Sequence, residues 1–422
     1  MKRRTFLSLA AAGMALGGVA PAVLAAGKPA RVVVVGGGFA GSACAKYIRR
    51  WSPTTEVILV DPSAYFVSCP MSNRVIGGMM SIRDLTRSRN SLASGHGVQL
   101  VRASVDAIDA DARRVRLDDG STIDYDRLVL APGIDFMYES MPGFESSAAR
   151  SAMPHAWRAG DQTRDLRQRV MALPEGGVFA MHIPPAPYRC PPGTYERACL
   201  VANTIKRANK RAKVLIFDAN PDIVAKRDLF MAAFRNEYRD IIEYVPNARF
   251  ESANAAQGSV DLDIQAGVEA DVWNIVPPQQ ASALLRNAGL ANVADRWCSV
   301  DFLTYESRVA SNIHIIGDSI ASAPGMPKSG HMANQQAKVC AGAIAALLAG
   351  RAPNDEPIIA NTCYSFVNEK EAIHIAAVYG YDAQNATMVV VPGSGGLSEA
   401  PSSEEGFMAV AWAFNILNDT LS

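Results

Sequence analysis

The sequence predicts an α/β protein with two Rossmann-like dinucleotide-binding domains, the second inserted in the first, and an α+β domain at the C-terminus. Two strand–turn–helix–strand patterns predict this class, one within residues 31–60 and one within residues 177–218. The length of 422 residues also exceeds what one ordinary hydrophobic core holds. We expect the first domain at residues 29–150 and 300–350, the second at 151–299 and the third at 351–422.

The composition is that of a globular protein and disfavours a nucleic-acid partner. Hydrophobic residues make up 49% of the chain and charged residues 19%. The 41 basic residues are matched by 41 acidic ones, so no basic excess is present to bind a phosphate backbone. After the N-terminal segment we find no uninterrupted apolar run long enough to span a bilayer.

The first 26 residues have the pattern of a twin-arginine export signal. Arg3 and Arg4 precede a weakly apolar stretch that ends in small residues at Ala25 and Ala26. An ordinary secretory signal or a membrane anchor is the alternative, but three glycines and a proline dilute the apolar stretch. We therefore expect a periplasmic protein that acquires its cofactor before export. Removing the segment leaves a mildly acidic chain.

The first pattern contains every part of a dinucleotide-binding unit. A β-branched strand at 31–35 leads into the turn GGGFAG, a helix is expected at 42–50, and a second strand at 56–60 ends at Asp61. A carboxylate at that position, twenty residues after the turn, can bind the hydroxyls of the adenosine ribose. A bound dinucleotide is therefore strongly favoured over a plain glycine-rich turn.

Three glycines of the turn have separate tasks in such a unit. Gly36 allows the tight turn, Gly38 lets the pyrophosphate approach the backbone, and Gly41 lets the helix pack closely on the strand. The unpaired N–H groups at the start of the helix then face the phosphates.

Two later segments favour FAD over NAD. An apolar strand ends in Ala131, Pro132 and Gly133, and a strand far downstream ends in Gly317 and Asp318. Both resemble the later FAD motifs of the two-dinucleotide-domain flavoprotein disulfide reductase superfamily. In that resemblance the carboxylate matched by Asp318 contacts the ribityl chain of the flavin.

The second dinucleotide unit has an unusual turn. Strands are expected at 177–183 and 213–218 with a helix at 195–209, but the turn at 184–193 is rich in proline instead of glycine. Proline has no N–H group to donate and its ring is bulky, so phosphates cannot lie against this turn in the usual way. We infer that NAD(P)H is not a substrate and that electrons enter from another donor.

Three of the seven cysteines are candidates for chemistry. Cys190 lies in the proline-rich turn just before a helix, where a thiol is expected to have a lowered pKa. Glu196 in the first helical turn is either a proton acceptor beside it or a carboxylate favoured by the helix dipole. Cys69 follows the second strand at a place that can reach a flavin ring. Spacing alone does not pair Cys190 with the distant Cys363.

Long segments resemble the flavoprotein subunit of flavocytochrome c sulfide dehydrogenase. They occur in order through nearly the whole chain after the N-terminal segment: YFVSCPMSNRVIGG (65–78), PHAWRAGDQT (154–163), PAPYRCPPGTYERA (185–198), GDSIASAPGMPKSG (317–330) and NTCYS (361–365). The resemblance implies that Cys69 attaches FAD covalently through the flavin 8α position. It also implies that Cys190 and Cys363 are the redox-active pair beside the flavin, and that the chain from about Arg351 forms an interface with a haem-bearing subunit.

Some residues depart from the family pattern. Pro70 follows the flavin-linking cysteine where an aromatic residue is expected. Four cysteines look additional and are expected to be buried thiols: Cys44, Cys199, Cys298 and Cys340. Lys328, in the turn after Asp318, either places positive charge or a helix start near the flavin or is a solvated lysine.

The resemblance implies that sulfide attacks the Cys190–Cys363 disulfide and leaves a persulfide on one of the two sulfurs. An electron pair then passes to FAD, and oxidised sulfur leaves as sulfur or polysulfide. The chain has no Cys-x-x-Cys-His haem motif, so we expect a c-type cytochrome as a separate subunit in a heterodimer. The apolar segment 407–417 is either an interface helix or part of the core.

Three other functions remain open from the sequence. A sulfide:quinone oxidoreductase shares the fold, FAD and cysteines but contacts the membrane. A non-catalytic flavoprotein accessory to a thiosulfate-oxidising system is a second alternative. An NADH-dependent disulfide reductase is a third, and the proline-rich turn disfavours it.

Overall fold

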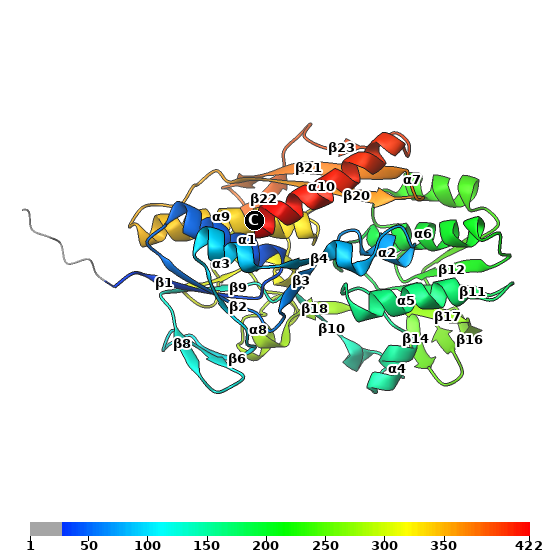
Figure 1. The fold of residues 1–422 in the computed structure, drawn as a ribbon, viewed down its shortest axis with the longest axis horizontal. Coiled ribbons are helices and arrows are strands. Elements are labelled where there is room, and N and C mark those ends of the chain that lie inside the picture. The colour runs from blue at the N-terminus through cyan, green and yellow to red at the C-terminus, as the bar shows by residue number, and fades with distance from the viewer. Residues whose placement is uncertain (1–27) are drawn as a thin grey trace, which may run out of the picture.

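The computed structural model describes residues 28–422, and the predicted export signal lies outside this range. Figure 1 shows two α/β units side by side, with a C-terminal sheet and a long helix lying across both. The predicted fold class is confirmed. Within residues 28–422, no helix combines the length and apolar character needed to cross a bilayer.

The first unit is built on a parallel five-stranded sheet in the order β19-β9-β1-β2-β5. Its strands are β1 (Arg31–Val35), β2 (Glu56–Val60), β5 (Gln99–Val101), β9 (Arg127–Leu130) and β19 (Ile313–Ile315). The first two have the bounds that the β-branched runs predict. Helices α1 (Phe39–Trp51) and α9 (Gly330–Leu348) pack together on this sheet, and the valines of β1 form the centre of the core.

The second unit contains a parallel sheet in the order β13-β12-β11-β17. Its strands are β11 (Val178–Ile183), β12 (Lys213–Asp218), β13 (Ile242–Pro246) and β17 (Val272–Ile275). The surrounding helices are α5 (Asp161–Ala172), α6 (Gly193–Arg207) and α7 (Arg227–Ala232). The chain returns to the first sheet only at β19, so this unit is inserted in the first, as predicted.

Smaller elements complete these two units. Antiparallel sheets are formed by β6 (Val105–Asp109), β7 (Arg114–Leu117) and β8 (Thr122–Asp124), and by β14 (Phe250–Asn254), β15 (Ser259–Leu262) and β16 (Gln265–Glu269). Two-stranded pairs are β3 (Tyr65–Val67) with β4 (Thr86–Ser88), and β10 (Ile134–Phe136) with β18 (Gln279–Ala281). The short helices are α2 (Ser72–Ile76), α3 (Asn90–His96), α4 (Ser147–Ala152) and α8 (Ala283–Asn287).

The C-terminal domain is an antiparallel sheet covered by one helix. Its elements are β20 (Ile358–Phe366), β21 (Ala372–Asp382), β22 (Thr387–Val390), β23 (Gly396–Leu397) and α10 (Ser403–Leu421). Strand β20 contacts both α9 of the first unit and α6 of the second. One strand of this domain therefore reaches the boundary between the two units.

One side of helix α10 is part of the core, as one of the two interpretations of segment 407–417 expected. Ala409, Ala413 and Leu417 are buried in the cores. Phe407 is 77% exposed and Met408 is also exposed. The helix therefore packs on one side and presents apolar side chains to solvent near its start.

Candidate active site at the meeting of three domains

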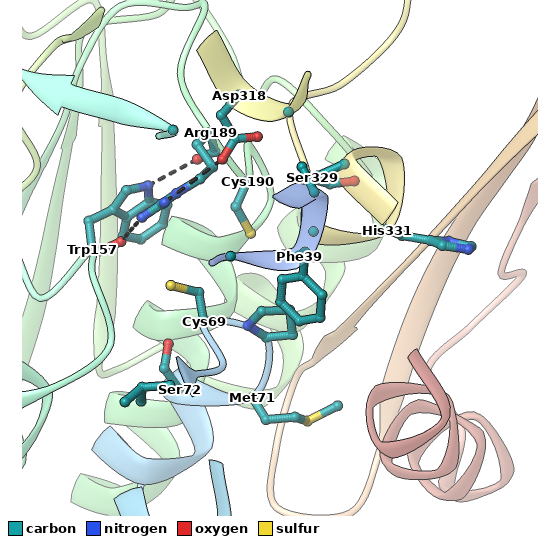
Figure 2. Close-up of a pocket in the computed structure, with 18 of the residues that line it drawn as sticks. Phe39, Cys69, Met71, Ser72, Trp157, Arg189, Cys190, Asp318, Ser329 and His331 are labelled. Atoms are coloured by element: carbon teal, nitrogen blue, oxygen red, sulfur yellow. Dashed lines mark hydrogen bonds and ion pairs between the residues drawn. The ribbon is translucent and has the colours of Figure 1, made fainter. Parts of the chain in front are cut away.

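A cavity of about 280 Å³ lies where the three domains meet. Its lining includes the glycine turn of the first unit, the cysteine turn of the second and part of β20. Of the predicted residues, those lining the cavity are Gly36, Gly38, Asp61, Cys69, Ala131, Pro132, Gly133, Cys190, Glu196, Asp318 and Cys363. Figure 2 shows Cys69, Cys190 and Asp318 around this space.

The glycines differ in what surrounds them. Gly36 has a φ of +96°, and a Cβ added there would lie 2.4 Å from the Ala131 carbonyl oxygen. A Cβ added at Gly41 would lie 1.8 Å from the Gly36 oxygen. A Cβ added at Gly38 would meet nothing within 4 Å. The protein's own packing therefore requires Gly36 and Gly41, whereas Gly38 borders open space in which a pyrophosphate fits.

Asp61 is held at the edge of the glycine turn. Its Oδ2 accepts a hydrogen bond from Gly37 N at 2.6 Å, and its Oδ1 lies 3.3 Å from Arg89 Nη2. Arg89 also donates from Nε to the Gly37 carbonyl at 2.9 Å. Arg89, which no sequence motif indicated, fixes the carboxylate where a ribose would bind.

We call the glycine turn, Asp61 and the residues after β9 and β19 the FAD cradle. Its second carboxylate is Asp318, just after β19. Its Oδ2 lies 3.8 Å from Nη1 of Arg189, and the N–H of Gly317 donates to Gln336 Oε1 at 2.8 Å. Gly133 has a φ of +75° and open space beside it. A glycine turn, two carboxylates and this second turn, all at the carboxyl ends of parallel strands, fit FAD.

The turn of the second unit offers few free N–H groups to a phosphate. Three of its N–H groups already have partners: Ala186 N donates to Asn220 Oδ1, Arg189 N to Gln279 Oε1 and Cys190 N to the Lys328 carbonyl, each at 2.9 Å. Because its prolines also lack N–H groups, the turn supports the inference that NAD(P)H does not bind here.

The carboxylate at the end of β12 already has hydrogen-bond donors from within the protein. Asp218 Oδ2 accepts hydrogen bonds from the hydroxyls of Tyr195 at 2.7 Å and Tyr244 at 3.0 Å. Asp218 occupies the place in this unit where Asp61 lies in the first. Its buried carboxylate serves the protein's own tyrosines instead of a ribose.

Cys190 and Cys363 come from different domains and line the same cavity. Cys190 has a φ of +56° and lies just before α6, and a Cβ added at Gly193 would come within 2.8 Å of its sulfur. Cys363 lies on β20. All seven cysteines are free thiols in the structure. The disulfide implied by the resemblance stays a prediction.

The expected low pKa of Cys190 is wrong for this structure. Burial raises the pKa of its thiol, and the neighbouring Cys363 and Glu196 raise it further. The positive charges of Arg189 and Lys226 oppose this rise without cancelling it. The start of α6 is too weak an electrostatic influence to outweigh removal of the thiol from water.

Glu196 joins the elements that carry the two cysteines. Its Oε2 accepts from Asn73 Nδ2 at 2.7 Å, and its Oε1 accepts from Phe366 N on β20 at 2.9 Å. Burial raises the pKa of this carboxyl group. These contacts favour the proton-acceptor interpretation over a carboxylate held only by the helix dipole.

Arg197 is a buried cation in the lining of the cavity, and it was not among the predicted site residues. It donates to Asn73 Oδ1 at 3.0 Å, to Asn274 Oδ1 at 2.8 Å and to the His155 carbonyl at 2.8 Å. Its guanidinium lies over the Trp157 ring at 4.8 Å, and burial lowers its pKa to about 9. Arg197 lies within the segment 185–198 that carries the family resemblance, and this was the sequence signal that could have found it.

Cys69 lies between β3 and α2, and its carbonyl accepts from Ser72 N at 3.0 Å. The next residues, Pro70 and Met71, also line the cavity, and Met71 has a φ of +72°. Figure 2 shows the Cys69 and Cys190 side chains bordering the same cavity. Covalent attachment of FAD through Cys69 stays a prediction.

Of the two alternatives for Lys328, the solvated lysine is contradicted, whereas the start of α9 that follows it, at Ser329 and Gly330, lines the cavity. Lys328 is only 6% exposed, so it is not a solvated lysine. Its ammonium lies over the Trp297 ring at 3.9 Å and donates to the Ile320 carbonyl, and it does not line the cavity. Burial lowers its pKa to about 8. Its link to the site is the backbone carbonyl that accepts from Cys190.

Family models match three stretches of the chain. The model for the central part of the sulfide dehydrogenase (flavocytochrome c) flavoprotein chain matches residues 163–277. The model for the flavin-binding part of flavocytochrome c sulphide dehydrogenase matches residues 355–421. Pyridine nucleotide-disulphide oxidoreductase matches residues 30–172. The flavoprotein chain of this enzyme from Chlorobaculum thiosulfatiphilum is 58% identical over 45 residues, which is 11% of this chain and 94% of that sequence.

The chain belongs to the flavocytochrome c sulfide dehydrogenase flavoprotein family. The resemblance to this family is thus confirmed, and the protein is a flavoprotein oxidoreductase with FAD as its cofactor. The members of this family are sulfide-oxidising enzymes by name.

Longer matches lead to sulfide:quinone oxidoreductases. The mitochondrial protein of Dictyostelium discoideum is 22% identical over 302 residues, covering 68% of this chain and 65% of that protein. The Aquifex aeolicus enzyme is 25% identical over 330 residues, covering 74% and 75%. A solved structure of the Aquifex enzyme has a TM-score of 0.77 at 20% identity, covering 93% of this chain and 91% of that one, and establishes a shared fold.

Proposed function

We propose that the protein oxidises sulfide to sulfur or polysulfide through Cys190 and Cys363 and passes the electrons singly to a c-type cytochrome. The observation that carries the proposal is the convergence of these two cysteines, from different domains, on the cavity that holds the FAD cradle. Family membership supports the substrate, because the family is named for sulfide oxidation.

In this proposal the chain supplies a disulfide that sulfide can attack and a carboxyl group nearby that can accept a proton. Sulfide attacks one sulfur of a Cys190–Cys363 disulfide, so the S–S bond breaks, a persulfide forms on the attacked cysteine and the other leaves as a thiolate. Glu196 lies beside both elements and takes up the proton released from the attacking sulfide. Bound FAD supplies the acceptor for the electron pair and a way to release electrons one at a time.

The C-terminal domain supports a protein acceptor. Near the start of α10, Phe407 is exposed together with Met408, and Leu397 of β23 is also exposed. Exposed apolar side chains of this kind are typical of interaction surfaces. We therefore place the cytochrome subunit, with its haem, on this face.

Reduction of quinone is the second candidate for the final electron transfer. The sulfide:quinone oxidoreductases of Dictyostelium and Aquifex match much more of the chain than the cytochrome-linked relative does.

We place the mature protein in the periplasm, reached by the twin-arginine route, where a soluble or bound cytochrome is accessible.

Anaerobic sulfide titration of the purified flavoprotein tests the proposal. Stoichiometric bleaching of the flavin, followed by recovery of its colour on adding cytochrome c, is expected. If the flavin colour returned with a quinone analogue and not with cytochrome c, the electron acceptor would be a quinone. A flavin that sulfide leaves unbleached would favour the accessory role, and bleaching by NADH would contradict the inference from the proline-rich turn.

A further inference from the structure

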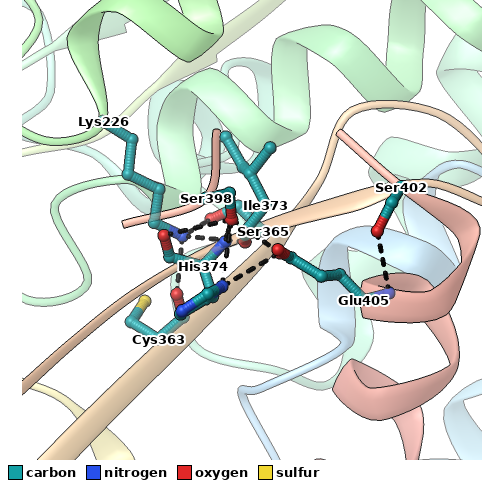
Figure 3. A network of polar contacts seen from close by, with 8 residues as sticks. All are labelled: Lys226, Cys363, Ser365, Ile373, His374, Ser398, Ser402 and Glu405. Atoms are coloured by element: carbon teal, nitrogen blue, oxygen red, sulfur yellow. Dashed lines mark hydrogen bonds and ion pairs between the residues drawn. The ribbon is translucent and has the colours of Figure 1, made fainter. Parts of the chain in front are cut away.

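Lys226 is a buried lysine whose side chain connects the second unit to the C-terminal domain. It is only 4% exposed and lies just before α7, with a φ of +56°. A residue other than glycine in this left-handed region is uncommon and costs free energy, so the surroundings must maintain it. Figure 3 shows the side chain reaching Cys363 and its neighbours on the C-terminal sheet.

All three N–H donors of the Lys226 ammonium have hydrogen-bond partners, and each partner is an uncharged oxygen. Nζ donates to the Cys363 carbonyl at 2.6 Å, to Ser365 Oγ at 2.9 Å and to the Ile373 carbonyl at 3.3 Å. These contacts satisfy its three donors without neutralising its charge. A buried cation is costly unless it meets negative charge, and it can meet such charge here when a sulfur of the site is anionic.

Four titratable groups near this ammonium favour its charged form, and they come from four different segments. Cys363 on β20, Glu196 on α6, Cys190 in the turn and Glu405 on α10 all favour its charged form, while burial lowers its pKa. Glu405 is itself held by Ser398 Oγ at 2.6 Å and lies 3.1 Å from His374 Nδ1. Cys363 is thus the titratable group whose backbone the ammonium contacts directly.

The influence on Cys363 has a clear direction. Burial raises the pKa of the Cys363 thiol, Glu196 adds to the rise, and Lys226 is the positive group that opposes it. Cys190 differs, because both Arg189 and Lys226 oppose the rise in its pKa. Cys363 therefore depends on one cation where Cys190 has two.

We propose that Lys226 is a positioning residue of the active site whose charge stabilises anionic sulfur on Cys363, as a thiolate or as a persulfide anion. This inference rests on the proposed function, in which opening the disulfide leaves negative charge on buried sulfur. A thiol leaves or attacks as its anion, so a nearby cation favours each step in which Cys363 carries that charge.

Alkylation of Cys363 tests the charge effect without sulfide turnover. The protein with its FAD is prepared in a Cys190→Ser background, reduced, and treated with iodoacetamide from pH 6 to 11. Peptide mass spectrometry then measures the rate at Cys363, and the pH midpoint of that rate reports its thiolate. The fully buried Cys44, Cys199, Cys298 and Cys340 react slowly and are distinguished by their peptides.

Three substitutions at position 226 separate charge from hydrogen bonding. Lys226→Met removes both, Lys226→Gln keeps a donor without charge, and Lys226→Arg keeps the charge. We expect the midpoint to rise by at least about one pH unit in the Met and Gln variants, which slows alkylation at pH 7.5 about tenfold or more. The Arg variant should stay close to the parent, as should Lys206→Met, which alters an exposed lysine on α6.

An unchanged midpoint in Lys226→Gln, with FAD content and melting temperature preserved, would overturn the proposal, and a rise in the Met variant alone would mean a structural role. If the Met variant fails to fold, the Gln and Arg variants decide. The sulfide titration is independent: bleaching with an unchanged midpoint refutes only the role of Lys226, whereas a shifted midpoint without bleaching refutes only sulfide oxidation.

Discussion

Glu196 on α6 accepts a hydrogen bond at 2.9 Å from the backbone N–H of Phe366 on β20. Glu196 lies six residues after Cys190, and Phe366 lies three residues after Cys363. One carboxyl group therefore connects α6, which follows the Cys190 turn, to β20, which carries Cys363, and burial raises its pKa.

Replacing this carboxyl group should slow the reaction with sulfide. We expect Glu196→Gln to lower the rate of flavin bleaching on the order of a hundredfold, because a proton acceptor is lost. In the parent protein the rate should fall at acidic pH as Glu196 becomes protonated, and this limb should disappear in the variant. Stopped-flow bleaching across pH checks both, with the exposed Glu243→Gln as control.

The same group predicts how stability changes with pH. A carboxyl group whose pKa is raised on folding stabilises the folded protein below its unfolded-state pKa, and this contribution is lost as pH rises through the folded pKa. Between acidic and neutral pH, the free energy of unfolding should therefore fall less in Glu196→Gln than in the parent. Unfolding by denaturant at several pH values measures both. Equal slopes in the two proteins would contradict the raised pKa.

Cys190→Ser should keep FAD but eliminate bleaching by sulfide. The substitution removes one partner of the proposed disulfide and leaves the cradle of the first unit unchanged. Cys199→Ala is the matched control, since Cys199 lies on the adjacent helix, is fully buried and does not line the cavity. Bleaching that persists at the parent's rate in Cys190→Ser would refute the assigned electron route.

The two glycines at the start of α1 should respond differently to alanine. In Gly41→Ala the new Cβ meets the Gly36 oxygen at 1.8 Å, so we expect a loss of stability of about 3 kcal/mol or more. In Gly38→Ala the Cβ meets no protein atom within 4 Å, so the apoprotein should keep its melting temperature while FAD content falls. Normal FAD content in Gly38→Ala would place the pyrophosphate elsewhere.

The link through Cys69 is tested by precipitation with acid. Yellow colour should remain with the precipitated parent polypeptide and pass into the supernatant in Cys69→Ala, because only a covalent bond survives unfolding. Cys298→Ala, at a buried cysteine outside the cavity, should behave like the parent. Colour lost from the parent itself would refute the linkage.

Phe407→Glu should weaken electron transfer to cytochrome c without affecting flavin bleaching. A large exposed aromatic side chain at an interface typically contributes about 2 kcal/mol, so the apparent affinity for cytochrome should fall more than about tenfold. Met171→Glu provides the control, because Met171 is 51% exposed on α5 of the second unit. Equal effects of both substitutions would argue against a docking site on α10.

Four parallel strands were predictable because each is a short, nearly continuous apolar run that is mostly buried: β1, β2, β11 and β12. β1 and β2 have the expected bounds, and α6 differs from expectation by two residues at each end. The C-terminal strands were not predicted. The two long ones, β20 and β21, are only partly buried, and β20 packs against α9 and α6, so their pairing depends on tertiary contacts.

The sequence by itself determined the dinucleotide unit and the likeness of the cysteine segments to a known family, because glycine turns and proline-rich turns act through local backbone geometry. Only the tertiary structure decided that Cys363 lies in the same cavity as Cys190, that burial raises the pKa of Cys190, and that Arg197 and Lys226 lie buried near the sulfurs. These properties arise from desolvation and charge at the meeting of three domains, and residues far apart in sequence create them together.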